Sequence, residues 1–107
     1  MATVATSPTQ RTLAALRADG WLPAVVEKWN PHARIRQDLY GFIDILAVRD
    51  GETLAIQACS GSSTSARVDK ITNHENLSAV RKAGWRIEVW AWRKLKAGWQ
   101  ARVVDLS

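Results

Sequence analysis

Asp44 and Gln57 are the two polar side chains whose types and spacing could support chemistry. They lie in two apolar, β-type segments, 41–49 and 52–59, which Asp50-Gly51 separates. Asp-Gly is a preferred two-residue hairpin turn, and it fixes how the two segments pair outward from it. Asp44 then lies directly opposite Gln57, with Cβ atoms roughly 5 Å apart on one face. A carboxylate beside an amide oxygen offers the hard oxygen ligands that Mg²⁺ prefers.

The alternation of apolar residues supports the same pairing. A shift by one residue would bury Asp44 in the core, so the pattern predicts Asp44, Gln57 and Cys59 on the solvent-facing side of the hairpin. An Asp within a strand can instead be satisfied by an arginine or by backbone donors, and this alternative stays open. The opposite face is apolar and is expected to form the core, with Ile43, Ile45, Ala47, Leu54, Ile56 and Ala58.

Helices and strands on either side must position this hairpin. Ser7-Pro8-Thr9-Gln10 predicts a helix start, because Ser caps helices and Pro fits the first helical position. A helix over 8–19, a strand over 21–29 and a loop or strand entry over 33–38 precede the hairpin. A flexible loop over 61–65 and a helix over 67–84, interrupted near Asn73, follow it. Strands over 86–92 and 99–106, joined by a basic turn over 93–98, complete the chain.

The order α-β-β-β-α-β-β predicts an α/β protein. Three strands would form an antiparallel meander, and a right-handed β-α-β crossover would add a parallel strand. The expected architecture is a mixed central sheet flanked by helices. The length of 107 residues suits a single domain over residues 1–107, with residues 1–7 expected as a disordered tail.

Composition narrows the function classes. One cysteine excludes an internal disulfide and a Cys-rich zinc site. No window resembles a secretory signal or a membrane span, so we expect a cytoplasmic protein without a membrane partner. Fifteen Lys and Arg oppose ten Asp and Glu, giving a net charge of +5. A basic surface favours polyanions, although the same charge also serves solubility alone.

The layout of helix, strand, hairpin with a polar residue in each arm, helix and strand resembles the PD-(D/E)XK nuclease superfamily. Its small Holliday-junction-resolvase-like and phage-type members are the most similar in kind. The matching stretches are 41–47 and 54–59, and 37–44 resembles the segment that introduces the family's aspartate. The resemblance implies a restriction-endonuclease-like fold. It also implies a metal-dependent nuclease.

Carried over by residue, the resemblance makes Asp44 the metal-ligating aspartate and puts Gln57 at the second acidic position. Cys59 falls where the family has its catalytic lysine, and a neutral thiol cannot supply that positive charge. Lys70 is the candidate replacement, with an ordinary surface lysine as the alternative. Glu27 is a candidate third ligand for Mg²⁺ or Mn²⁺, and otherwise a solvated strand residue. Asp38 is a lesser candidate, since Asp before a strand is common in turns.

The implied partner is nucleic acid. We expect DNA, in branched or structured form, and a homodimer, because so short a chain offers little surface to DNA. The alternative is a catalytically degenerate module that keeps the nuclease fold and binds nucleic acid without cleaving it. A third hypothesis is a protein-interaction domain. Trp90, Trp92 and Trp99 could stack on bases, but packing is the commoner role. The candidate phosphate contacts are basic residues: Arg34, Arg36, Arg67, Arg93, Lys94 and Lys96.

Overall fold

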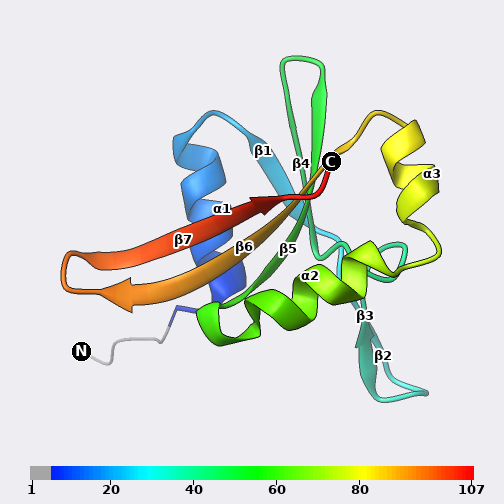
Figure 1. Ribbon diagram of the computed structural model, residues 1–107, viewed down its shortest axis with the longest axis horizontal. Coiled ribbons are helices and arrows are strands. Elements are labelled where there is room, and N and C mark those ends of the chain that lie inside the picture. Colours follow the sequence, from blue (N-terminus) through cyan, green and yellow to red (C-terminus); the bar gives the residue numbers. More distant parts are fainter. Residues whose placement is uncertain (1–5) are drawn as a thin grey trace.

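A five-stranded mixed sheet forms the centre of the molecule (Figure 1). The computed structural model describes residues 6–107. The strand order is β1-β4-β5-β6-β7, and β5 and β6 form a parallel pair while the other neighbours are antiparallel. The predicted α/β class, with a meander followed by a parallel crossover, is confirmed at this level. The strands are β1 Leu22–Val25, β4 Ile45–Arg49, β5 Glu52–Ser60, β6 Arg86–Leu95 and β7 Gly98–Asp105.

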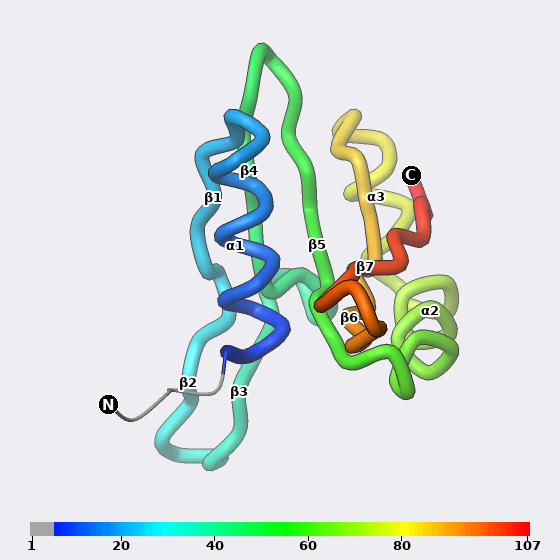
Figure 2. Tube along the Cα trace, turned by 90° about the vertical axis from the view of Figure 1, so that its left-hand side faces the viewer, coloured from blue at the N-terminus to red at the C-terminus, as the bar shows by residue number. Residues whose placement is uncertain are grey.

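Helices cover both faces of this sheet (Figure 2). Helix α1, Pro8–Ala18, lies on one face. As predicted, Ser7 caps this helix: its Oγ accepts a hydrogen bond from the backbone N–H of Gln10 at 3.1 Å. Across the sheet lie α2 and α3, and the predicted interruption near Asn73 is confirmed because Asn73 caps the end of α2. These elements are η1 Gly61–Ser63, α2 Thr64–Thr72 and α3 Leu77–Lys82.

Three sequence expectations need correction or restriction. The segment 21–29 is not one strand: β1 ends at Val25, and β2, Lys28–Asn30, pairs with β3, Ile35–Gln37, in a separate ribbon. The segment 61–65 is not a flexible loop, because η1 and the first turn of α2 order it. Residues 1–5 of the predicted tail lie outside the described residues, whereas Ser7 is fixed as a helix cap.

The hairpin pairing is confirmed. Arg49 pairs with Glu52, and the ladder continues to Ile45 opposite Ile56. Asp50 and Gly51 have φ of 48° and 79°, the left-handed values that a type I′ turn requires. Local turn chemistry therefore fixes this part of the sheet.

Both faces of the hairpin are buried, which corrects the expected solvent-facing side. The face predicted as core packs on Leu13 and Leu16 of α1. The other face is covered by the crossover helices, because strands in a parallel pair are usually enclosed on both sides. Ile43 was assigned to the first face but belongs to the second cluster. Its neighbours there include Phe42, Ala55, Cys59, Ile71 and Val80.

Gly41 holds the segment that leads into β4. Its φ is +90°, and a Cβ at this position would collide with the imidazole of His74. Tyr40 beside it also has a positive φ, 55°. Two left-handed residues in sequence make this a tightly specified turn between Asp38 and Asp44.

Gly41→Ala is expected to destabilise the fold by about 2 kcal/mol, because backbone strain and a collision add together. Gly84→Ala is the matched control: Gly84 has φ +80°, but no atom lies within 4 Å of its added Cβ. That control should cost only about 1 kcal/mol, the strain alone. Urea denaturation measures both, and equal losses would contradict the collision with His74.

Candidate functional site

Asp44 and Gln57 lie side by side, as the hairpin predicted. Gln57 Nε2 donates to Asp44 Oδ2 at 2.9 Å, and the amide of Ala58 lies 3.2 Å from both carboxylate oxygens. Asp44 comes directly before β4 and is 4% exposed, and Gln57 in β5 is 3% exposed. The predicted adjacency is confirmed, but the pair is buried rather than exposed on the sheet surface.

Asp38 and Lys70 complete this group. Gln57 Nε2 lies 3.4 Å from Asp38 Oδ2, and Lys70 Nζ lies 3.2 Å from both Asp38 Oδ2 and Gln57 Oε1. Asp38 directly follows β3, and Lys70 comes from the last turn of α2. We call these four residues the Asp44 cluster. Only tertiary packing brings Asp38 and Lys70 to the hairpin, because they lie 19 and 13 residues from Gln57 in the sequence.

The cluster opens into a polar cavity of about 470 Å³. The beginnings of two helices border it, through Pro8 and Thr9 of α1 and Ser63 before α2. Helix N-termini carry partial positive charge, which favours anionic groups in the cavity. The remaining lining residues are Glu27, Arg36, Asp38, Asp44, Gln57, Ala58, Cys59, Ser60, Arg67 and Lys70.

The electrostatics of Asp44 are unusual. Burial raises the pKa of its carboxyl from 3.8 to about 7, and the negative charges of Asp38 and Glu27 act in the same direction. Hydrogen bonds from Gln57 and Ala58 only partly oppose that effect. Near neutral pH the carboxylate is therefore held in a place where negative charge is costly, and a bound cation would relieve that cost.

Glu27 lines the cavity, but its carboxylate is paired with Arg36. Its Oε1 accepts from Arg36 Nη1 at 2.8 Å. Over residues 6–107, no group of three or more His, Cys, Asp or Glu side chains is placed to hold a metal ion. Gln57 lies next to both Asp38 and Asp44, and its amide oxygen offers a further ligand of another type.

The donor set of the cluster suits Mg²⁺ or Mn²⁺ after one rearrangement. Two carboxylates, Asp38 and Asp44, and an amide are hard ligands. Gln57 now directs its NH₂ group at Asp44, so its amide must turn by half a rotation to direct Oε1 there. Nε2 would then face Lys70, and two donors cannot bond each other. Lys70 must therefore release Gln57 when a cation enters.

Cys59 supplies no positive charge to the Asp44 cluster. It is 5% exposed within the second core cluster. Burial raises the pKa of its thiol, although the Arg67 charge opposes this. The thiol is neutral at pH 7, so Lys70 is the ammonium group that reaches the cluster.

The predicted nucleic-acid contacts fall into three groups. Arg36 and Arg67 line the cavity. Arg34 lies at the turn of the β2–β3 ribbon, where its φ is +54°. The other three are exposed on the β6–β7 hairpin, with Arg93 beside Gly61 and Lys94 and Lys96 farther toward the tip.

The tryptophans mostly pack, which was the commoner expectation. Trp90 packs against the α1-side core, and Trp92 Nε1 donates to Thr12 Oγ1 at 2.9 Å. Trp99 is different, since it is 46% exposed and the Arg11 guanidinium lies 3.6 Å from its ring centre. It is the most exposed of the three, whereas Trp90 and Trp92 are half-buried.

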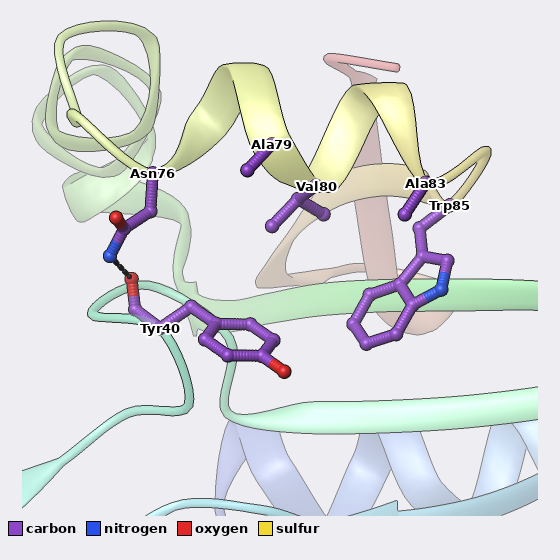
Figure 3. Close-up of a pocket in the computed structure, with 6 residues that line it drawn as sticks. All are labelled: Tyr40, Asn76, Ala79, Val80, Ala83 and Trp85. Atoms are coloured by element: carbon purple, nitrogen blue, oxygen red, sulfur yellow. Dashed lines mark hydrogen bonds between the residues drawn. The ribbon is translucent and has the colours of Figure 1, made fainter.

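A second cavity, of about 360 Å³, lies between α3 and the turn at Tyr40 (Figure 3). Tyr40 and Trp85 lie next to each other on the side across from α3, with ring centres 6.1 Å apart. Asn76 Nδ2 donates to the Tyr40 carbonyl at 3.0 Å and fixes the turn. The wall is otherwise Ala79, Val80 and Ala83, so this cavity is apolar and separate from the Asp44 cluster.

Comparisons of the chain with protein-family models, with curated proteins and with solved structures find no match. Of the helices in residues 6–107, none has the length and apolar character needed to cross a membrane.

Proposed function

We propose that this chain is a metal-dependent endonuclease acting on DNA, of the PD-(D/E)XK type, with the Asp44 cluster as its active site. One observation carries the proposal. A buried carboxylate with a raised pKa is joined to a second carboxylate, an amide and an ammonium group at an open polar cavity. Perturbed acids in a cavity are typical of functional sites. The net charge of +5 suits a polyanionic substrate.

In this proposal Asp44, Asp38 and the Gln57 oxygen hold Mg²⁺ or Mn²⁺. The metal, when bound, activates a water molecule and offsets charge on the phosphate. Hydrolysis forms a bond from water oxygen to phosphorus and breaks one ester bond. The attacking water gives up a proton, the leaving ester oxygen takes one up, and charge grows on the phosphate oxygens. Lys70, released from Gln57, is placed to contact these oxygens. Glu27 keeps Arg36 at the cavity mouth, where the guanidinium meets the phosphate backbone.

The deciding experiment is a cleavage assay with Mn²⁺ on duplex, single-stranded and four-way-junction DNA. Wild type should cleave at least one of these, and Asp44→Asn should not. Asp69→Asn is the matched control, because it makes the same change on an exposed residue of α2 outside the cavity lining. Cleavage that survives in Asp44→Asn would exclude the cluster as the active site.

Lys70→Met should lower the cleavage rate by about a hundredfold, because it removes the ammonium charge but nearly keeps the length of the side chain. Lys70→Arg should retain more of the rate. Single-turnover kinetics measure both variants, and the thermal midpoint checks their fold. A Met variant that cleaves like wild type would remove Lys70 from the mechanism.

The second candidate is a module that binds nucleic acid without cleaving it. One observation favours it: the polar side chains of the Asp44 cluster have hydrogen-bond partners without a cation. Within residues 6–107, no buried side-chain nitrogen or oxygen lacks such a partner. The thiol of Cys59 in place of a lysine points the same way. Salt-dependent DNA binding by wild type, without cleavage under any divalent cation, would select this alternative.

We also expect a homodimer, since a chain of 107 residues offers little surface to DNA. Sedimentation equilibrium measures the assembly state. A monomer at the concentrations that cleave DNA would remove the dimer from the proposal.

A further inference from the structure

The β2–β3 ribbon, residues 28–37, projects from the end of the sheet at which α1 begins (Figures 1 and 2). Its two strands pair antiparallel from Lys28 opposite Gln37 to Asn30 opposite Ile35. None of its residues is buried, and none belongs to either core cluster. Short isolated hairpins are marginally stable in water. The ribbon therefore adds little to the core, and its sequence is free to serve another role.

The ribbon nevertheless has a defined shape. Asn30 Oδ1 accepts hydrogen bonds from the amides of His32 and Ala33, at 3.0 and 3.2 Å, which fixes the turn. At the other end, the ion pair between Arg36 and Glu27 ties the ribbon to the cavity mouth. A pre-formed element loses less conformational entropy when it binds a partner.

Its side chains combine positive charge with exposed apolar surface. Lys28, Arg34 and Arg36 carry three positive charges, and residues 28–37 contain no acid. Trp29 and Ile35 are 54% and 50% exposed. Cations bind phosphates, and apolar side chains contact sugars and base edges or wedge between base steps. This combination matches nucleic acid, whose phosphates can take the cations while its sugars and bases contact the apolar side chains.

The ribbon is continuous with the proposed active site. Glu27 directly precedes β2, and Asp38 directly follows β3. Both residues line the polar cavity. A polyanion that lies along the ribbon is thereby led to the Asp44 cluster.

We propose that the β2–β3 ribbon docks into a groove of double-stranded DNA, with Lys28 and Arg34 on the phosphates. Trp29, which shares a face of the ribbon with Arg36, then lies against the groove floor. A two-stranded ribbon fits the major groove of duplex DNA. Cations lie on β2, on β3 and at the turn, so the ribbon presents charge toward both walls of a groove. This inference rests on the proposed function, because it names the form of DNA that the same site receives.

The test measures binding without catalysis. Fluorescence anisotropy in EDTA follows a short labelled duplex and its single strand across a salt series. Lys28→Gln with Arg34→Gln removes two ribbon charges, and Arg17→Gln with Lys82→Gln removes two exposed charges from α1 and α3. The ribbon pair should weaken duplex binding about tenfold or more and lower the salt slope by about two. The control pair should change affinity by less than about threefold.

Trp29→Ala should weaken duplex binding without changing the salt slope, because it removes no charge. Circular dichroism melting checks that each variant is folded. Equal losses in the ribbon and control pairs would overturn the inference, as would equal losses for single strand and duplex.

The same variants in the Mn²⁺ cleavage assay separate this inference from the proposed function. Duplex cleavage by wild type that the ribbon pair leaves unchanged would reject the ribbon and leave the nuclease proposal standing. Wild type that neither binds nor cleaves any DNA would reject both.

Discussion

Asp44→Asn should abolish cleavage, by about a thousandfold or more, and at the same time stabilise the folded chain above pH 7. Both effects have one origin. The carboxylate is kept where burial opposes its charge, so its pKa rises to about 7. A neutral amide at the same place avoids that cost, but it supplies no negative charge for a cation.

The pH dependence follows from linkage. At pH values below 3.8 Asp44 is protonated in the folded and the unfolded chain, and it contributes no pH-dependent free energy. Between 3.8 and about 7 the unfolded chain loses the proton first, so the free energy of unfolding falls. Above about pH 7 Asp44 is charged in both states, and the loss in the free energy of unfolding has reached its full value of roughly 4 kcal/mol.

Asp44→Asn should recover only part of this free energy of unfolding, about 1–3 kcal/mol at pH 8. The asparagine NH₂ group replaces a carboxylate oxygen that accepts from the Ala58 backbone N–H, so one hydrogen bond is lost. Urea denaturation at pH 5 and at about pH 8 measures the difference between variant and wild type, with Asp69→Asn as control. The advantage of Asp44→Asn should be larger at the higher pH. An advantage that is the same at both values would contradict the raised pKa.

Millimolar Mn²⁺ should raise the thermal midpoint of wild type at about pH 8. A cation that binds only the folded chain stabilises it by about 1.4 kcal/mol at ten times its dissociation constant. For a domain of this size that corresponds to roughly 5–10 °C. The shift should shrink at pH 5, where protons compete for Asp44.

Two variants test where the cation binds. Asp44→Asn and Asp38→Asn should each lose the Mn²⁺ shift, whereas Asp69→Asn should keep it. A shift that survives in Asp44→Asn would place the cation elsewhere. Because the readout is stability, it holds whether or not the chain cleaves DNA.

The hairpin and its polar pair were predictable because their causes are local. Asp50-Gly51 specifies the turn, and the two-residue turn sets the pairing that continues along both arms. No residue outside 41–59 was needed to set Asp44 beside Gln57. The helix start at Ser7 was predictable for the same reason.

The burial of the pair was not predictable from these patterns. It depends on α2 and α3 covering the second face, and the residues that do so lie far along the chain. Lys70 reaches Gln57 only through that packing, and Asp38 does so only through the strained turn at Tyr40 and Gly41. The separate ribbon was missed because strand-forming residues lie on both sides of the break, with Val25 before it and Trp29 after it. Propensity does not show where a chain leaves one sheet for another.

Cys59 is a natural site for chemical labelling of the region between β5 and α2. It is the only thiol in the sequence and lies in β5 beneath α2, 5% exposed and with its pKa raised by burial. Because the thiol also lines the polar cavity, a thiol reagent can reach it from the cavity or when α2 lifts from β5. Slower labelling in the presence of Mn²⁺ or DNA would therefore show which ligand occupies the cavity or suppresses that opening.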